Sequence, residues 1–176
     1  MVDLTADFFS LFQLPRAFRL DGGALDARYR EVQAQVHPDR FTQGSDAERR
    51  LSMQWATRAN EAYQTLKTPL ERGKYLLHLA GRDIQAENNT AMSVDFLMAQ
   101  MEWREAVAEA RQGGDHHELE RLRHRLQGDV AGRYDELGRL LDDARDYDGA
   151  VDRVRRLMFL EKLIVEIDDA LASLDE

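Results

Sequence analysis

The sequence contains no cysteine, only 3 prolines and 11 glycines among its 176 residues, and no long apolar run. The absence of cysteine excludes disulfides, thiol nucleophiles and cysteine-ligated metal or iron–sulfur sites formed by this chain. No segment approaches the roughly 18 apolar residues that a membrane span needs. The first residues, MVDLTADFF, begin acidic and lack a basic stretch followed by a long apolar one, so we expect no secretory signal and a cytoplasmic protein.

Charge is plentiful but unevenly distributed. Residues 1–82 carry 12 Lys/Arg and 10 Asp/Glu, whereas residues 83–176 carry 12 and 23, within an overall net charge of −9. A nucleic-acid-binding protein is expected to present a basic face, so the composition argues against a DNA or RNA partner. The contrast between the two parts indicates two modules that meet different partners.

Helical periodicity and the scarcity of breakers predict an all-α fold. In the N-terminal part we expect helices over about 6–12, 24–36, 46–66 and 69–79, with Gly22–Gly23 as a turn before the second. Ser45 and Glu48 have the spacing of a capping box, and Pro69 suits a first helical position. The second and third helices should form an antiparallel hairpin through two apolar stripes: Leu25, Tyr29, Val32 and Val36, and Leu51, Trp55, Ala59, Ala62 or Tyr63, and Leu66.

The C-terminal part predicts three helices, over about 93–112, 115–144 and 148–174. Short connections favour antiparallel neighbours, so a three-helix up-down-up bundle is the simplest arrangement. The polar stretch after Gly81 lacks periodicity. We therefore predict an N-terminal domain over 1–81, a linker over 82–90 and a C-terminal domain over 91–176.

The tripeptide His37-Pro38-Asp39 lies in the loop of the predicted hairpin. Pro38 disfavours helix at His37, so the second helix should stop there and expose an imidazole and a carboxylate. Alone, the tripeptide is better interpreted as a turn with a capping Asp than as a binding site. An enzyme using His37 and Asp39 as a general base pair is disfavoured, because nothing apolar surrounds the pair to shift a pKa. We therefore expect no catalytic residues.

The order of elements around this tripeptide resembles the J-domain of DnaJ-type co-chaperones across roughly residues 5–80. The run Arg58-Ala59-Asn60-Glu61-Ala62-Tyr63, with Leu66 and Pro69, is similar to the third-helix signature of that domain. The resemblance implies binding to the ATP state of a DnaK-type chaperone and stimulation of its ATP hydrolysis. The residues it assigns to chaperone binding are His37, Pro38, Asp39, Arg28, Arg30 and Arg40. Asp26 and Glu31 depart from the basic pattern of several relatives, so electrostatic docking is expected to be weaker or the chaperone specialised.

Four further runs, HPDRF, TPLERGKYLLHLAG, VDFLMAQMEWREAVAEA and RVRRLMFLEKL, extend the resemblance over nearly the whole chain. They are similar to the HscB family, the J-type co-chaperones of bacterial iron–sulfur cluster biogenesis. This resemblance implies delivery of the scaffold protein IscU to the DnaK-type chaperone HscA. We accordingly expect a monomer with no cofactor, no bound metal, and no nucleic-acid or membrane partner.

A second candidate site lies on the helix predicted over 93–112. Phe96, Trp103, Val107 and Ala110 already form one buried stripe, and further apolar and acidic residues lie beside it. Phe159 lies well off the buried stripe of the last helix and should sit at a bundle edge. On periodicity alone, a partner surface and a bundle core with a solvated acidic edge are equally supported. The HscB resemblance implies IscU binding by Leu97, Met98, Met101, Glu102, Glu105, Glu109 and Phe159.

Three alternatives remain at this point. A metal site from His116, His117 and His124 is less favoured than a solvated polar face, because no carboxylate pair completes it. A general DnaK-type chaperone could be the partner, with the C-terminal bundle serving dimerisation or another client. A purely structural protein is the third. Burial of Leu97, Met98 and Met101 would remove the surface that IscU delivery requires.

Overall fold

The computed structural model describes residues 3, 5–84 and 92–174. The chain divides into two compact units, Met1–Leu76 and Leu77–Glu176. The described residues form helices and turns without a strand, which confirms the predicted all-α class. None of the helices in these ranges has the length and apolarity to cross a membrane. Of the predicted linker 82–90, residues 85–90 lie outside the described residues.

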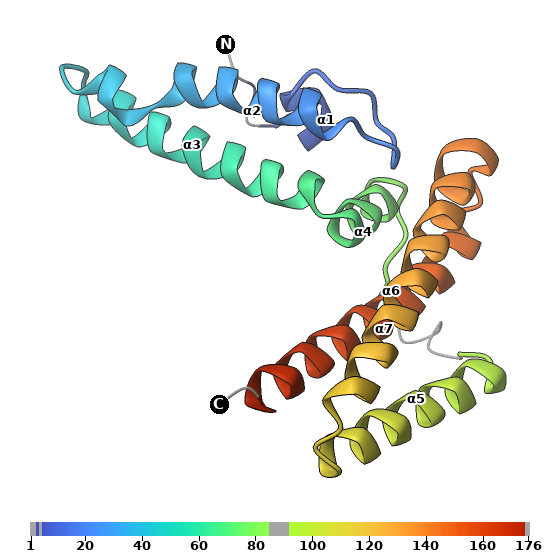
Figure 1. Cartoon of the computed structure of the whole chain (residues 1–176). Helices are drawn as coiled ribbons and strands as arrows, with labels where there is room; N and C mark the ends of the chain where they lie inside the picture. Colours follow the sequence, from blue (N-terminus) through green and yellow to red (C-terminus); the bar gives the residue numbers. More distant parts are fainter. Residues whose placement is uncertain (1–2, 4, 85–91, 175–176) are drawn as a thin grey trace. The chain divides into compact units, whose positions relative to one another are not determined.

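The first unit is built on a long helical hairpin (Figure 1). Its elements are α1 (Phe8–Leu11), α2 (Gly22–Val36), a 3-10 turn (Pro38–Phe41), α3 (Asp46–Lys67) and the start of α4 (Pro69–Leu79). Helices α2 and α3 pack along each other and α1 packs on α3. The predicted antiparallel hairpin is therefore present, and the tripeptide loop lies at its tip.

Local capping sets where these helices begin. The Asp21 side chain accepts hydrogen bonds from the backbone N–H groups of Gly23 and Ala24, so α2 starts at Gly22. The expectation that Gly22–Gly23 form a turn before the helix was therefore wrong. The capping residue is Asp21, and both glycines lie in the first turn of α2. The Ser45–Glu48 capping box is confirmed, and the bonds from the Ser45 amide and hydroxyl lower the pKa of Glu48.

The inner face of α3 differs in one respect from the predicted stripe. Leu51 is 41% exposed and Trp55 is half-buried, whereas Ser52 is only 1% exposed. The Ser52 hydroxyl donates a 2.6 Å hydrogen bond to the carbonyl of Val36, the last residue of α2. That carbonyl has no partner within its own helix. Its need for a donor places a serine, rather than the neighbouring leucine, against α2.

Hydrogen bonds of two α4 side chains connect this helix to the rest of the first unit. The buried Arg72 donates from Nε to the Phe18 carbonyl and from Nη1 to the Leu66 carbonyl, both at 2.7 Å. The Tyr75 hydroxyl accepts from the Phe8 amide at 3.0 Å, and its ring stacks on that of Phe8. Burial raises the pKa of Tyr75.

The second unit contains α5 (Val94–Gln112), α6 (His116–Gly138), a wider π-helical turn (Arg139–Ala144) and α7 (Tyr147–Leu174). Helices α6 and α7 pack most extensively, and α5 packs against both. The predicted stripe of the middle helix is confirmed as buried: Leu119, Leu122, Leu126, Val130, Leu137 and Leu141. The prediction of a single helix over 115–144 was wrong at its C-terminal end, where the backbone widens into a π-helical turn. The change begins directly after Gly138, and glycine is the residue with the greatest backbone freedom.

Helix α5 contributes less to the core than its neighbours. It buries only Phe96, Val107 and Ala110. Trp103, expected in the core, is half-buried, and the Arg125 guanidinium lies over its ring at 4.8 Å from the centroid. Most of the circumference of α5 therefore remains available to a partner.

Ser52→Ala should lower the free energy of unfolding by about 1–2 kcal/mol, because it leaves the buried Val36 carbonyl without its donor. Thr57→Ala is the matched control on the same helix, since the exposed Thr57 hydroxyl bonds only to the Met53 carbonyl. The control should change stability by no more than about 0.5 kcal/mol. Urea unfolding followed by circular dichroism measures both, and equal effects would contradict the role given to Ser52.

Candidate functional site

The tip of the hairpin presents a histidine and an aspartate on a rigid turn. His37 has an extended backbone, and Pro38 opens the 3-10 turn that follows. The Nδ1 atom of His37 accepts a hydrogen bond from the Asp39 amide at 3.2 Å. The two side chains are 55% and 85% exposed. Because Nδ1 acts as an acceptor, a neutral His37 carries its proton on Nε2, and the tip offers a partner one donor beside one carboxylate.

The three arginines assigned with the tip do not share one face. Arg28 and Arg30 lie two positions apart on α2, which is about 200° around a helix. Arg30 donates to the Asp26 carbonyl at 3.2 Å, and Arg40 donates to the Ala34 carbonyl at 3.1 Å. Neither contact neutralises a charge. Since position 34 follows Arg30 by one turn, Arg30 and Arg40 lie on the same side of α2, with Arg40 next to the tip and Arg30 directed back toward Asp26.

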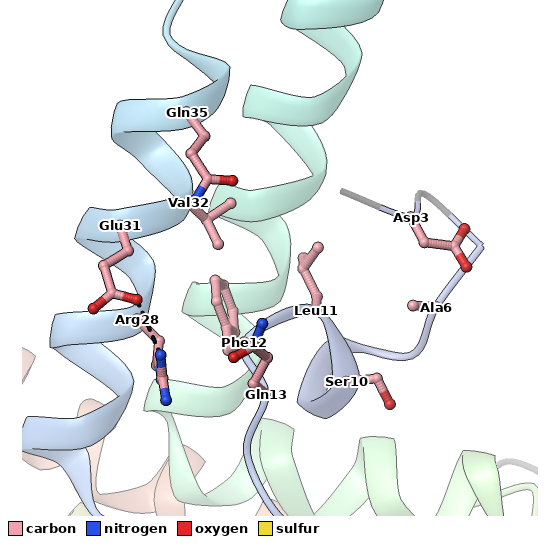
Figure 2. Close-up of a pocket in the computed structure, with 10 residues that line it drawn as sticks. All are labelled: Asp3, Ala6, Ser10, Leu11, Phe12, Gln13, Arg28, Glu31, Val32 and Gln35. Carbon is pink, nitrogen blue, oxygen red and sulfur yellow. Dashed lines mark hydrogen bonds and ion pairs between the residues drawn. The ribbon is translucent and has the colours of Figure 1, made fainter. Parts of the chain in front are cut away.

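Arg28 lies on the other side of α2, at a cleft of about 370 Å³ between α1 and α2 (Figure 2). Its guanidinium pairs with Glu31 at 3.1 Å. Leu11, Phe12 and Val32 contribute apolar surface to the cleft. The positive charge of Arg28 is therefore partly offset by Glu31.

Asp26, the other acidic departure noted in the sequence, has a structural task. Its carboxylate accepts a 2.7 Å hydrogen bond from the Tyr63 hydroxyl of α3. The Tyr63 ring stacks on Tyr29 of α2, with centroids 4.1 Å apart. This acid therefore joins the two helices of the hairpin, and its presence on α2 is accounted for within the fold.

The outer face of α5 carries a row of exposed apolar side chains. Leu97, Met98 and Met101 are 45%, 56% and 71% exposed, so these three side chains are not bundle core. Val94, 70% exposed, lies on the same face, three and four positions before Leu97 and Met98. The sequence analysis missed Val94, although continuing the same spacing by one turn toward the N-terminus would have found it. We call these four residues the apolar strip.

Beside the strip runs an acidic row formed by Glu102, Glu105 and Glu109. All three are exposed, and none has an ion pair in the part of the chain that the structure describes. Their spacing of three and four places like charges next to one another, at a cost of about 0.2–0.5 kcal/mol per pair. Helices α6 and α7 show the opposite arrangement, with compensated pairs at the same spacings: Arg121–Glu118, Arg123–Glu120, Arg133–Asp129 and Arg156–Asp152. The acidic row is thus unfavourable for the isolated fold.

Phe159 of α7 borders the strip at the edge of the bundle, as predicted. It is half-buried, and its ring meets the buried Phe96 ring of α5 edge-to-face at 5.9 Å. The Arg104 guanidinium lies over the Phe159 ring at 5.3 Å from its centroid. Seven residues named from the sequence therefore come from two packed helices of one unit.

Comparison with known proteins agrees with this geometry. A family described as the HSCB C-terminal oligomerisation domain matches residues 92–168. A co-chaperone protein HscB homolog of Aromatoleum aromaticum is 56% identical over 174 residues, covering 99% of this chain and 98% of that protein. The chain belongs to the HscB co-chaperone family. Membership confirms the resemblance to J-type co-chaperones of iron–sulfur cluster biogenesis.

Two solved HscB structures share the fold. Chaperone HscB from Vibrio cholerae aligns with a TM-score of 0.84 and 33% identity, covering 96% of this chain and 99% of that one. The human co-chaperone protein HscB aligns with a TM-score of 0.88 and 31% identity, covering 94% and 82%. The predicted J-domain with a C-terminal helical domain is confirmed by these HscB structures, and family membership supports a co-chaperone rather than an enzyme.

The histidines of α6 do not form the alternative metal site. Among the described residues, no three His, Asp or Glu side chains converge as a metal ion requires, and His116, His117 and His124 are exposed.

Glu105→Lys should raise the free energy of unfolding by about 0.5–1 kcal/mol, because it replaces two like-charge pairs of the acidic row with two opposite-charge pairs. Glu120→Lys is the matched control on α6. It removes the 2.7 Å ion pair with Arg123 and should lower stability. Thermal unfolding at low salt measures both changes, and a loss of stability in both variants would contradict the strain assigned to the row.

Proposed function

We propose that this co-chaperone binds the iron–sulfur scaffold protein IscU through its C-terminal domain, delivers it to the DnaK-type chaperone HscA and stimulates the ATPase activity of HscA. The observation that carries the proposal is the surface of α5, where the exposed apolar strip lies beside an acidic row that the fold does not neutralise. Family membership supports both partners. The proposed domains are 1–81 and 91–176, joined by residues 82–90, and the cytoplasm stays the predicted compartment.

The tip supplies the chaperone-binding part of this proposal. The Nε2–H of His37 is a donor, the Asp39 carboxylate is an acceptor, and Pro38 limits the motion of both. Arg40 adds positive charge at the tip, and Arg30 adds a second charge further along the same side of α2. Such a surface fits a polar, partly acidic groove on the ATP state of the chaperone. Pre-organisation of the turn reduces the entropy lost when it docks.

The strip and the acidic row supply the scaffold-binding part. Burial of Leu97, Met98, Met101 and Phe159 against a partner would provide most of the affinity, since a few desolvated anchors dominate protein interfaces. The carboxylates of Glu102, Glu105 and Glu109 would face a basic rim on the scaffold. Charge pairs at such a rim mainly raise the association rate and exclude wrong partners.

Self-association is the second candidate role for the same surface. The matching family is described as an oligomerisation domain, and exposed apolar rows of this kind also join identical subunits. Against it, a two-fold dimer pairs the same surface of both copies, and on that surface Glu102, Glu105 and Glu109 outnumber the basic side chains. We therefore retain the monomer as the predicted state, and its mass in solution is part of the test below.

His37→Gln should abolish stimulation of HscA ATP turnover, because the flexible glutamine side chain does not hold an acceptor for the Asp39 N–H and an outward donor in the fixed positions of the imidazole ring. Steady-state phosphate release with purified HscA measures this. His78→Gln, at another exposed histidine away from the tip, is the matched control and should stimulate like the unmodified protein. Full stimulation by His37→Gln, with helical circular dichroism unchanged, would refute the chaperone-binding role of the tip.

The triple variant Leu97→Ala, Met101→Ala and Phe159→Ala should weaken IscU binding at least 100-fold, because it removes three anchors. Isothermal titration with purified IscU measures the affinity, and circular dichroism checks the fold. Val165→Ala, at an exposed apolar residue of α7 outside the strip, should bind normally. Unchanged binding by the triple variant would reject the scaffold site. A dimer that becomes monomeric in this variant, seen by light scattering, would favour self-association.

A further inference from the structure

Arg104 is an exposed positive charge on the side of α5 that meets Phe159, and Arg111 is the next basic residue along that side. In the described part of the chain the Arg104 guanidinium has no ion pair, and its recorded contact is with the Phe159 ring. The sequence denies it a partner on its own helix, since the residues three and four positions away are Gln100, Met101, Val107 and Ala108. Its placement is therefore set by the aromatic ring and not by the neighbouring glutamates.

Arg104 and the acidic row lie on different sides of α5, in the turns that follow the apolar strip. At about 100° per residue, Arg104 lies roughly 20° from Leu97, on the side of α5 that meets Phe159. Glu102, Glu105 and Glu109 lie roughly 80–140° from Leu97 in the other direction, on the side of Met98. Beyond the apolar strip, α5 thus has a positive side at Arg104 and a negative side at the acidic row.

A guanidinium held over a ring face by a cation–π contact uses none of its N–H donors on the ring, so they are free to meet a second group. Arg104 is exposed, so these donors are accessible to a partner that covers Phe159. A carboxylate or a backbone carbonyl is the acceptor that such a fork recognises. A basic residue of the partner would be repelled at this point, although it would be attracted at the opposite flank.

We propose that Arg104 determines the orientation in which the scaffold protein binds, by receiving an acceptor of that partner beside Phe159 while the acidic row faces the basic rim. The inference rests on the proposed function, because it concerns the same surface. It adds that the partner must carry opposite polarity on the two sides of its apolar patch. A partner turned end for end would place like charges against both flanks.

The direction in which Arg104→Glu changes the affinity for the scaffold distinguishes this proposal from attraction by net charge. Arg104→Glu makes the acidic protein more negative by two charges, so attraction of a basic partner by net charge alone would tighten binding. A local acceptor at Arg104 would instead be repelled, and binding would weaken. Arg104→Ala removes the donors without adding repulsion and should have an intermediate effect.

The experiment is isothermal titration of purified IscU with the full-length variants Arg104→Glu, Arg104→Ala and Arg111→Glu. Arg111 lies on the same flank of α5, two turns further along and exposed, so its variant changes the charge equally without touching Phe159. We expect at least 10-fold weaker binding for Arg104→Glu, a smaller loss for Arg104→Ala, and less than a 2-fold change for Arg111→Glu. Thermal unfolding confirms that each variant is folded.

Three results would overturn the orientation role. Unchanged or tighter binding by Arg104→Glu would show that net charge governs this flank. Equal losses of affinity in Arg104→Glu and Arg104→Ala would show that Arg104 only positions the Phe159 ring. Equal losses in Arg104→Glu and Arg111→Glu would assign the effect to the helix as a whole. The variant Leu97→Ala, Met101→Ala and Phe159→Ala is measured alongside. Normal IscU binding by this triple variant would reject the scaffold site itself. Weakened binding by the triple variant together with normal binding by Arg104→Glu would reject only the orientation role of Arg104.

Discussion

The first unit depends on a helix that must stop before Pro38 while its last carbonyl remains buried. Proline excludes helix at His37, and the carbonyl of Val36 is left without an intrahelical partner next to the apolar core. Ser52 supplies the missing donor from α3, which sets how α3 is rotated against α2. The same stop gives His37 the extended backbone that lets its Nδ1 accept the Asp39 amide. The forced end of α2 therefore accounts for both the packing of the hairpin and the chemistry of its tip.

The second unit distributes its apolar residues unequally among three helices. The long pair α6 and α7 buries continuous stripes against each other, whereas α5 buries only three residues and leaves four apolar side chains in solvent. The acidic row on the same helix adds repulsion that the neighbouring helices avoid by pairing their charges. Two costs, exposed apolar surface and uncompensated like charge, thus coincide on one face. A binding partner would relieve both, which is why this face is the strongest candidate in the unit.

Charges in the two units follow different rules. On the outside of the hairpin, acids that appeared to weaken a basic surface turn out to serve the fold: Asp26 joins α2 to α3 through Tyr63, and Glu31 pairs with Arg28. Of the three arginines assigned to chaperone binding, Arg30 and Arg40 have no ion pair among the described residues. On α5, in contrast, neither the acids nor Arg104 are used in ion pairs within the described residues. Charged side chains without an ion pair inside the fold are the ones available to partners.

The sequence by itself determined the helical class, most helix ends and the position of the tip, because caps, prolines and glycines act through hydrogen bonds and torsions between close neighbours. It could not decide whether Leu97, Met98 and Met101 are core or surface, since both produce the same helical period. Nor could it place Ser52 rather than Leu51 inside, or bring Arg104 onto Phe159. Each of these depends on how a helix is rotated against another helix, and that rotation is set by groups distant in the chain. Tertiary packing alone decided them.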